Sequence, residues 1–122
     1  MINIGYWQDQ KTLIFSAGNM QDLERLGQAL ARVREGEPLI VPGLDGFALV
    51  GCGYVNLTSG QPEQITASIE SVIMRLPPDT IAFASDKVSN LSQMPGPSHA
   101  YVDLNDFTII ISVGEDRVLV SR

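Results

Sequence analysis

The sequence offers few residues that could carry out catalysis. His99 is its only histidine and Cys52 its only cysteine, so a Ser–His–Asp or Cys–His relay has one histidine to draw on. A general base needs a partner that orients it, and a histidine in a polar stretch is more often simply solvated. Cys52 lies between Gly51 and Gly53 in an expected strand, where a small packed thiol is favoured over a nucleophile. We therefore expect no catalytic residues and no enzymatic activity.

The same residue types argue against a metal or cofactor site. One cysteine and one histidine fall short of the four such ligands in a structural zinc site. The acidic residues lack the Asp-x-Asp-x-Asp-Gly spacing of a calcium loop. Gly51-Cys52-Gly53 lacks the third glycine and the following helix of a dinucleotide-binding loop. The sequence thus predicts no metal and no cofactor.

Length and composition predict one folded domain over residues 1–122. Of its residues, 44% are hydrophobic and 18% are charged, which is too apolar for a disordered chain. The formal net charge of −6 repels nucleic acids and anionic membranes and attracts a basic protein. The first residues have no basic segment followed by an apolar run, and no apolar run is long enough to span a membrane. We therefore expect a cytoplasmic protein.

A helix near the N-terminus is the clearest element that the sequence predicts. Asn19 is expected to cap it, and residues 19–34 present one apolar face at spacings of three and four. The face consists of Leu23, Leu26, Leu30 and Val33. Gly36 and Pro38 are expected to end the helix.

Apolar residues at a period of two predict strands along much of the remaining chain. The expected strands are 2–7 and 12–16, which form a hairpin; 39–41; 47–57, with a bend at its glycines; 81–85; 100–104 and 107–113, which form a second hairpin around Asn105-Asp106; and 118–121. Segment 86–99 is expected to be a long polar loop. The last third of the chain is therefore predicted to be a β-meander.

Residues 62–76 fit two structures. One set of residues fits the apolar face of a helix that Pro62 would begin and Pro77-Pro78 would end: Ile65, Ile69, Val72, Ile73 and Leu76. A second set fits strand alternation: Ile65, Ala67, Ile69 and Ile73. We favour a helix over 63–76, because the segment is long for one strand. The predicted fold is α+β, a mostly antiparallel sheet of about six strands with one or two helices packed on one face.

Segment Leu13–Leu30, a strand followed by Gly18-Asn19 and the leucine-bearing helix, resembles the opening of small bacterial immunity proteins. These proteins are the antidotes encoded beside secreted or contact-delivered toxins. The resemblance covers about 18 residues, and its motif is a common way to begin a helix. It implies a cytoplasmic inhibitor that covers the active face of a cognate toxin. Together with the acidic charge, it leads us to expect a non-enzymatic, immunity-type protein-binding domain.

We expect the partner to bind at one end of the predicted meander. There the loop 86–99 would lie beside the turn that follows strand 107–113. Loops of this length are often functional, and nearby acidic residues would attract a basic surface. The expected partner-binding residues are Asp86, Met94, His99, Glu115 and Asp116.

Two other functions remain open. The bend in strand 47–57 would let a ligand approach the backbone closely, which is compatible with a small ligand-binding or enzymatic domain whose pocket lies near Cys52 and Tyr54. The apolar strand 118–121 would suit pairing with a second chain. The third hypothesis is therefore a self-associating structural protein that forms a homodimer through this C-terminal edge strand.

Overall fold

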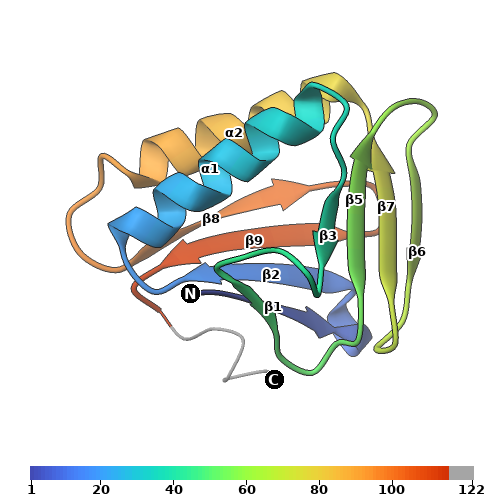
Figure 1. Ribbon diagram of the computed structural model, residues 1–122, viewed down its shortest axis with the longest axis horizontal. Coiled ribbons are helices and arrows are strands. Elements are labelled where there is room, and N and C mark those ends of the chain that lie inside the picture. The colour runs from blue at the N-terminus through green and yellow to red at the C-terminus, as the bar shows by residue number, and fades with distance from the viewer. Residues whose placement is uncertain (116–122) are drawn as a thin grey trace.

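The computed structural model describes residues 1–115, which form two sheets and two helices (Figure 1). The helices are α1 (Met20–Arg34) and α2 (Pro78–Leu91), and a 3-10 turn covers Gln8–Gln10. The strands are β1 (Ile2–Trp7), β2 (Thr12–Ala17), β3 (Leu39–Val41), β4 (Phe47–Leu49), β5 (Val55–Ser59), β6 (Gln64–Ala67), β7 (Val72–Leu76), β8 (Ser98–Asp103) and β9 (Thr108–Val113). The predicted α+β class is confirmed.

The strands form two mixed sheets, not a single antiparallel one. The first sheet has the order β4-β1-β2-β9-β8 and the second has the order β3-β5-β7-β6. The predicted hairpins are confirmed as the antiparallel pairs β1–β2 and β8–β9. The centre of the first sheet is the parallel pair β2–β9, in which Thr12 lies opposite Thr108. Two hairpins from opposite ends of the chain therefore share one sheet.

Helix α1 begins and ends as its sequence predicts. The Asn19 side-chain oxygen accepts a hydrogen bond from the backbone N–H of Asp22 at 2.9 Å, which satisfies one of the amides left unpaired in the first turn. The helix ends at Arg34, and Gly36 follows with a φ of 106°. The predicted leucine face is buried, because α1 packs against strands of both sheets.

The prediction of one long strand over 47–57 is wrong. β4 pairs with β1 in the first sheet, and β5 pairs with β3 and β7 in the second, so the chain crosses between sheets in the intervening loop. The crossing depends on the two glycines that were expected to bend the strand. Gly51 has a φ of 72°, and a Cβ on Gly53 would lie 2.7 Å from the carbonyl oxygen of Glu70.

The prediction of a helix over 63–76 is also wrong, since this segment forms the antiparallel hairpin β6–β7. The Ser68 hydroxyl oxygen accepts hydrogen bonds from the backbone N–H groups of Glu70 and Ser71, and this local turn separates the two strands. β7 then pairs in parallel with β5. The strand alternation that also fitted residues 62–76 is therefore the pattern that matches the observed structure.

The predicted strand 81–85 and loop 86–99 are replaced by α2 and a short connection. Pro78 occupies the first turn of α2, where the missing N–H of proline costs no hydrogen bond, so Pro77-Pro78 begins a helix instead of ending one. The buried face of α2 follows spacings of three, four and three: Ile81, Ala84, Val88 and Leu91. The predicted meander is therefore reduced to the hairpin β8–β9. The predicted strand 118–121 lies outside the described residues.

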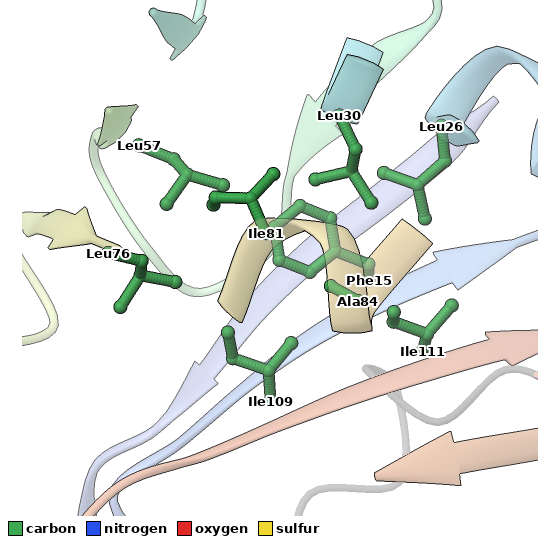
Figure 2. Close-up of a pocket in the computed structure, with 9 residues that line it drawn as sticks. All are labelled: Phe15, Leu26, Leu30, Leu57, Leu76, Ile81, Ala84, Ile109 and Ile111. Carbon is green, nitrogen blue, oxygen red and sulfur yellow. The ribbon is translucent and has the colours of Figure 1, made fainter. Parts of the chain in front are cut away.

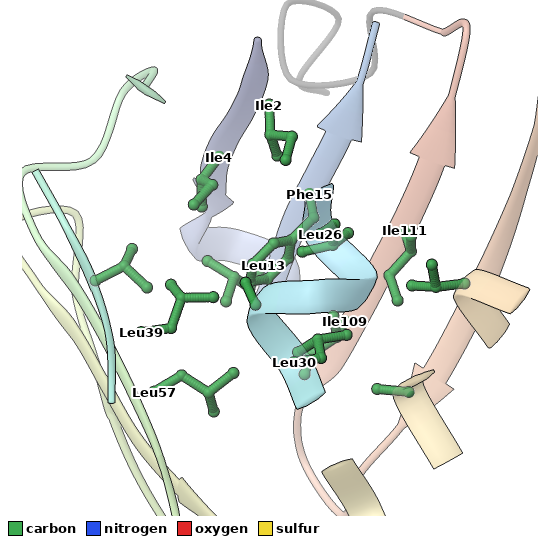
Figure 3. Packing of buried hydrophobic residues seen from close by; sticks show 14 of the residues in the cluster. Ile2, Ile4, Leu13, Phe15, Leu26, Leu30, Leu39, Leu57, Ile109 and Ile111 are labelled. Carbon is green, nitrogen blue, oxygen red and sulfur yellow. The ribbon is translucent and has the colours of Figure 1, made fainter. Parts of the chain in front are cut away.

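One hydrophobic cluster includes residues of both sheets and both helices. Figure 3 shows Leu39 and Leu57 of the second sheet directed toward the layer where Leu13 of β2 and Leu30 of α1 lie. The far face of the first sheet has a smaller buried cluster, in which Trp7 and Val50 pack on Ile14 and Ile110. The central strands β2 and β9 are consequently apolar on both faces.

Because the chain crosses between the sheets close to Gly53, we predict that a methyl group added at this position destabilises the fold. Gly53→Ala should lower the free energy of unfolding by about 1–3 kcal/mol, because the new Cβ would meet a backbone oxygen that cannot rotate away. Gly60→Ala is the matched control, since its Cβ would meet the flexible Arg75 side chain at 3.1 Å. Urea denaturation of both variants measures the difference, and equal stabilities would contradict the prediction.

Candidate functional site

His99 and Glu115, two of the predicted partner-binding residues, are in contact. His99 lies on β8, and its Nδ1 is 3.3 Å from Oε2 of Glu115, just beyond β9. The His99 ring also meets the Tyr101 ring edge-on, with centroids 5.4 Å apart. The backbone carbonyl of Glu115 accepts a hydrogen bond from the Ser16 hydroxyl at the end of β2. The Glu115 backbone is therefore tied to the first sheet.

Met94 lies at the same end of the first sheet. It belongs to the connection between α2 and β8, and half of its surface, 50%, is exposed. The connection passes close to the end of β9, because a Cβ on Gly114 would lie 3.5 Å from Cα of Pro97. The loop that carries Met94 thus lies against the segment that carries Glu115.

The other two predicted residues do not join this group. Asp86 is exposed on α2, five residues before the helix ends, and the rise of an α-helix places it about 7 Å from Leu91 along the axis. Asp116 lies outside the described residues. The predicted site is therefore brought together only at Met94, His99 and Glu115.

A groove runs between the two helices toward this end. α1 begins and α2 ends here, so the helices are antiparallel, and Gly27 lets them approach closely beside Val88. The groove has a volume of about 540 Å³, and the side chains that line it are mostly small or polar. Its lining is Met20, Leu23, Glu24, Gly27, Gln28, Ala31, Arg34, Ser85, Val88, Ser89 and Ser92. The buried Ser85 hydroxyl has no hydrogen-bond partner within residues 1–115.

Met20 is the residue that the sequence analysis missed. It lies at the first position of α1, is 43% exposed, and shares the groove with Ser92, two residues before Met94. Its spacing from Leu23 would place it on the buried face, but Met20 borders the open groove between α1 and α2 and stays partly exposed. We call the surface formed by Met20, Met94, His99 and Glu115 the methionine end.

Cys52 and Tyr54, near which a ligand pocket was predicted, lie in the loop between β4 and β5. The half-buried Cys52 thiol donates to the carbonyl oxygen of Tyr54 at 3.6 Å and packs against the main cluster. A small cavity lies at the centre of the core (Figure 2). Its volume is about 10 Å³ and its lining is entirely apolar, so it has no room or polar partners for a ligand.

A polar cleft of about 380 Å³ lies at the opposite end of the first sheet. Its lining is Tyr6, Lys11, Glu63, Ile65, Ala67, Asn105, Asp106 and Phe107. The rings of Tyr6 and Phe107 stack with centroids 5.9 Å apart. Lys11 has a φ of 48°, a left-handed conformation that is costly for a lysine. We call this the Tyr6 cleft.

Comparison with known proteins gives no relative from which to transfer a function. Neither protein-family models nor curated proteins nor solved structures match the chain.

Residues 1–115 contain no group of three or more His, Cys, Asp or Glu side chains arranged to hold a metal ion. No helix in this part of the chain has the length and apolar character needed to cross a membrane.

The raised pKa of Tyr6 leads us to predict that the free energy of unfolding falls at alkaline pH. Burial, and secondarily the nearby Cys52 thiolate, raise the pKa of Tyr6 above 10. The folded protein thus holds the phenol proton more tightly than the unfolded chain. The stabilisation is complete below about pH 10, the unfolded pKa, and is lost as pH rises through the folded pKa.

Tyr6→Phe should therefore show a smaller decline in unfolding free energy than the wild type above pH 10, as measured by urea denaturation. Cys52→Ser should keep most of the decline, because burial is the larger cause. A Tyr6→Phe variant with the wild-type pH dependence would contradict the assignment.

Proposed function

We propose that this chain is a non-enzymatic protein-binding domain that binds a basic partner protein at the methionine end. Most specifically, we propose an immunity-type inhibitor, located in the cytoplasm, that neutralises a cognate bacterial toxin. The main observation behind this site is the exposure of Met20, which lines the groove, and of Met94, two residues beyond the groove residue Ser92.

Exposed methionines suit a protein-binding surface. The methionine side chain is flexible and polarizable, so it adapts to an apolar partner surface. Of the four methionines, only Met74 is buried, while Met1, Met20 and Met94 are between 43% and 60% exposed. Met20 borders the groove between α1 and α2, and Met94 follows the groove residue Ser92 by two positions, so the groove could receive an extended segment or a loop of the partner.

The charge of the chain supports a basic partner. A net charge of −6 accelerates encounter with a positively charged surface, and this effect weakens as salt is added. Glu115 provides a carboxylate whose position is set by His99 and by the Ser16 bond to its backbone. Met94 and Glu115 thus combine an adaptable apolar contact with a fixed charge.

Co-expression tests the proposed neutralisation. The gene immediately upstream should encode a large secreted protein with a variable C-terminal domain, and co-expression of this chain should protect cells from that domain.

Met20→Ser and Met94→Ser should each weaken binding by about fivefold to tenfold, because each removes an apolar contact. Glu115→Lys, alone or with Asp116→Lys, should mainly slow association. Surface plasmon resonance at two salt concentrations separates these effects.

Ile73→Ser is the matched control, because Ile73 is 47% exposed on the second sheet, far from the methionine end in the fold. It should bind like the wild type. Absence of protection would contradict the toxin-neutralising function. Protection that survives all the substitutions at the methionine end would instead contradict the location of the site.

A second candidate function is the binding of a small polar molecule in the Tyr6 cleft. Its volume lies within the range of ligand sites, and Lys11, Glu63 and Asp106 provide charges of both signs. A ligand screen by nuclear magnetic resonance should then give shifts at these residues, and Lys11→Ala should abolish them. Absence of any ligand-dependent shift in the cleft would exclude this candidate.

A further inference from the structure

We infer that β8 is the contact strand of a homodimer, in which two copies of the first sheet join into one ten-stranded sheet. Among the strands of residues 1–115, β8 is the outermost one of the first sheet, with α2 packed along it (Figure 1). An edge strand of six residues presents backbone groups that a second strand can pair with. The inferred contact shares His99 with the methionine end, but it does not rest on the proposed toxin binding.

The hairpin turn fixes which backbone groups of β8 face outward. The N–H of Leu104 donates to the carbonyl of Phe107 at 2.8 Å, so these two residues form a hydrogen-bonded pair. In an antiparallel ladder such pairs recur at every second residue. Ser98, Ala100 and Val102 therefore direct their backbone groups toward β9, and the odd-numbered residues direct theirs toward the open edge. Tyr101 lies at the centre of this outward set.

Charge and the Pro97 backbone favour one register over two others for two antiparallel copies of β8. With the two-fold axis at Tyr101, His99 of each copy lies opposite Asp103 of the other, and an imidazole beside a carboxylate is a favourable cross-strand pair. An axis at Asp103 would oppose two carboxylates. An axis at His99 would bring Pro97, which has no N–H, opposite Tyr101. The register centred on Tyr101 avoids both penalties.

The flank of α2 adds an apolar contact to the strand pairing. Ser85 and Ser89 of α2 line the groove beside α1, so the flank that projects beyond β8 lies on the other side of the helix. At 100° per residue, Phe83 and Lys87 fall on that outer flank. Phe83 is 48% exposed, and Lys87 Nζ lies 4.8 Å from its ring centroid. In the dimer the two α2 helices run antiparallel, and each covers the Phe83 of the other.

Sedimentation velocity of the full chain tests the dimer. Over two orders of magnitude in protein concentration, the mass should rise reversibly from the 13.2 kDa monomer to twice that value. Phe83→Ser and Asp103→Lys should each weaken self-association by about tenfold, through lost apolar contact and through loss of the carboxylate that faces His99. Ile73→Ser, with matched exposure on the second sheet, should dimerise like the wild type.

A cysteine cross-link tests the register. Directly opposed residues of a hydrogen-bonded antiparallel pair have Cα atoms about 5.5 Å apart, within disulfide range. Tyr101→Cys, in a Cys52→Ser chain, should form a disulfide-linked dimer under mild oxidation, whereas Thr66→Cys on the edge strand β6 should not. A monomer at all concentrations would overturn the inference, and so would a dimer unaffected by Phe83→Ser and Asp103→Lys. Equal cross-linking at the two positions would overturn the register.

Discussion

Burial of the apolar face of α1 is the interaction that holds the two sheets together. The sheets are not continuous with each other, and no described strand belongs to both. Leu26 and Leu30 of α1 surround the same small core cavity as Phe15 of the first sheet and Leu57 of the second (Figure 2). Since apolar burial is the main favourable term in folding, the position of the second sheet depends on this helix. Leu23, Leu26 and Leu30 thus determine the architecture as well as the stability of one helix.

The parts of the fold that depend on neighbouring residues could be predicted from the sequence. The Asn19 cap, the leucine face and the hairpin turn at Asn105-Asp106 depend on interactions within a few residues, and each was located correctly. Pro77-Pro78 was misinterpreted because proline is equally compatible with the end of one element and the first turn of the next. The spacing of Ile81, Ala84, Val88 and Leu91 contained the evidence for α2, but the polar residues between them favoured a loop.

The remaining errors have a non-local cause. Ile65 and Ile73 satisfy both a helical and a strand pattern, and only the availability of β5 as a partner decides between them. For the candidate site, the sequence located Met94, His99 and Glu115 at one end because a hairpin fixes chain direction. Met20 was missed because its exposure depends on how α2 lies beside the start of α1. That relation is a property of the assembled layers and has no signature in the local sequence.

The parallel pairing of β2 with β9 also determines the order in which the protein can fold as it is synthesised. Ser16 and Ser112, which share a hydrogen bond across this pair, are separated by 96 positions in the chain. The β1–β2 hairpin leaves the ribosome before β9, and its inner edge remains open until β9 emerges. Pairings of such long range are entropically slow to form. During translation the edge of β2, with Ile14 on one face and Phe15 on the other, therefore stays without its strand partner until β9 is made.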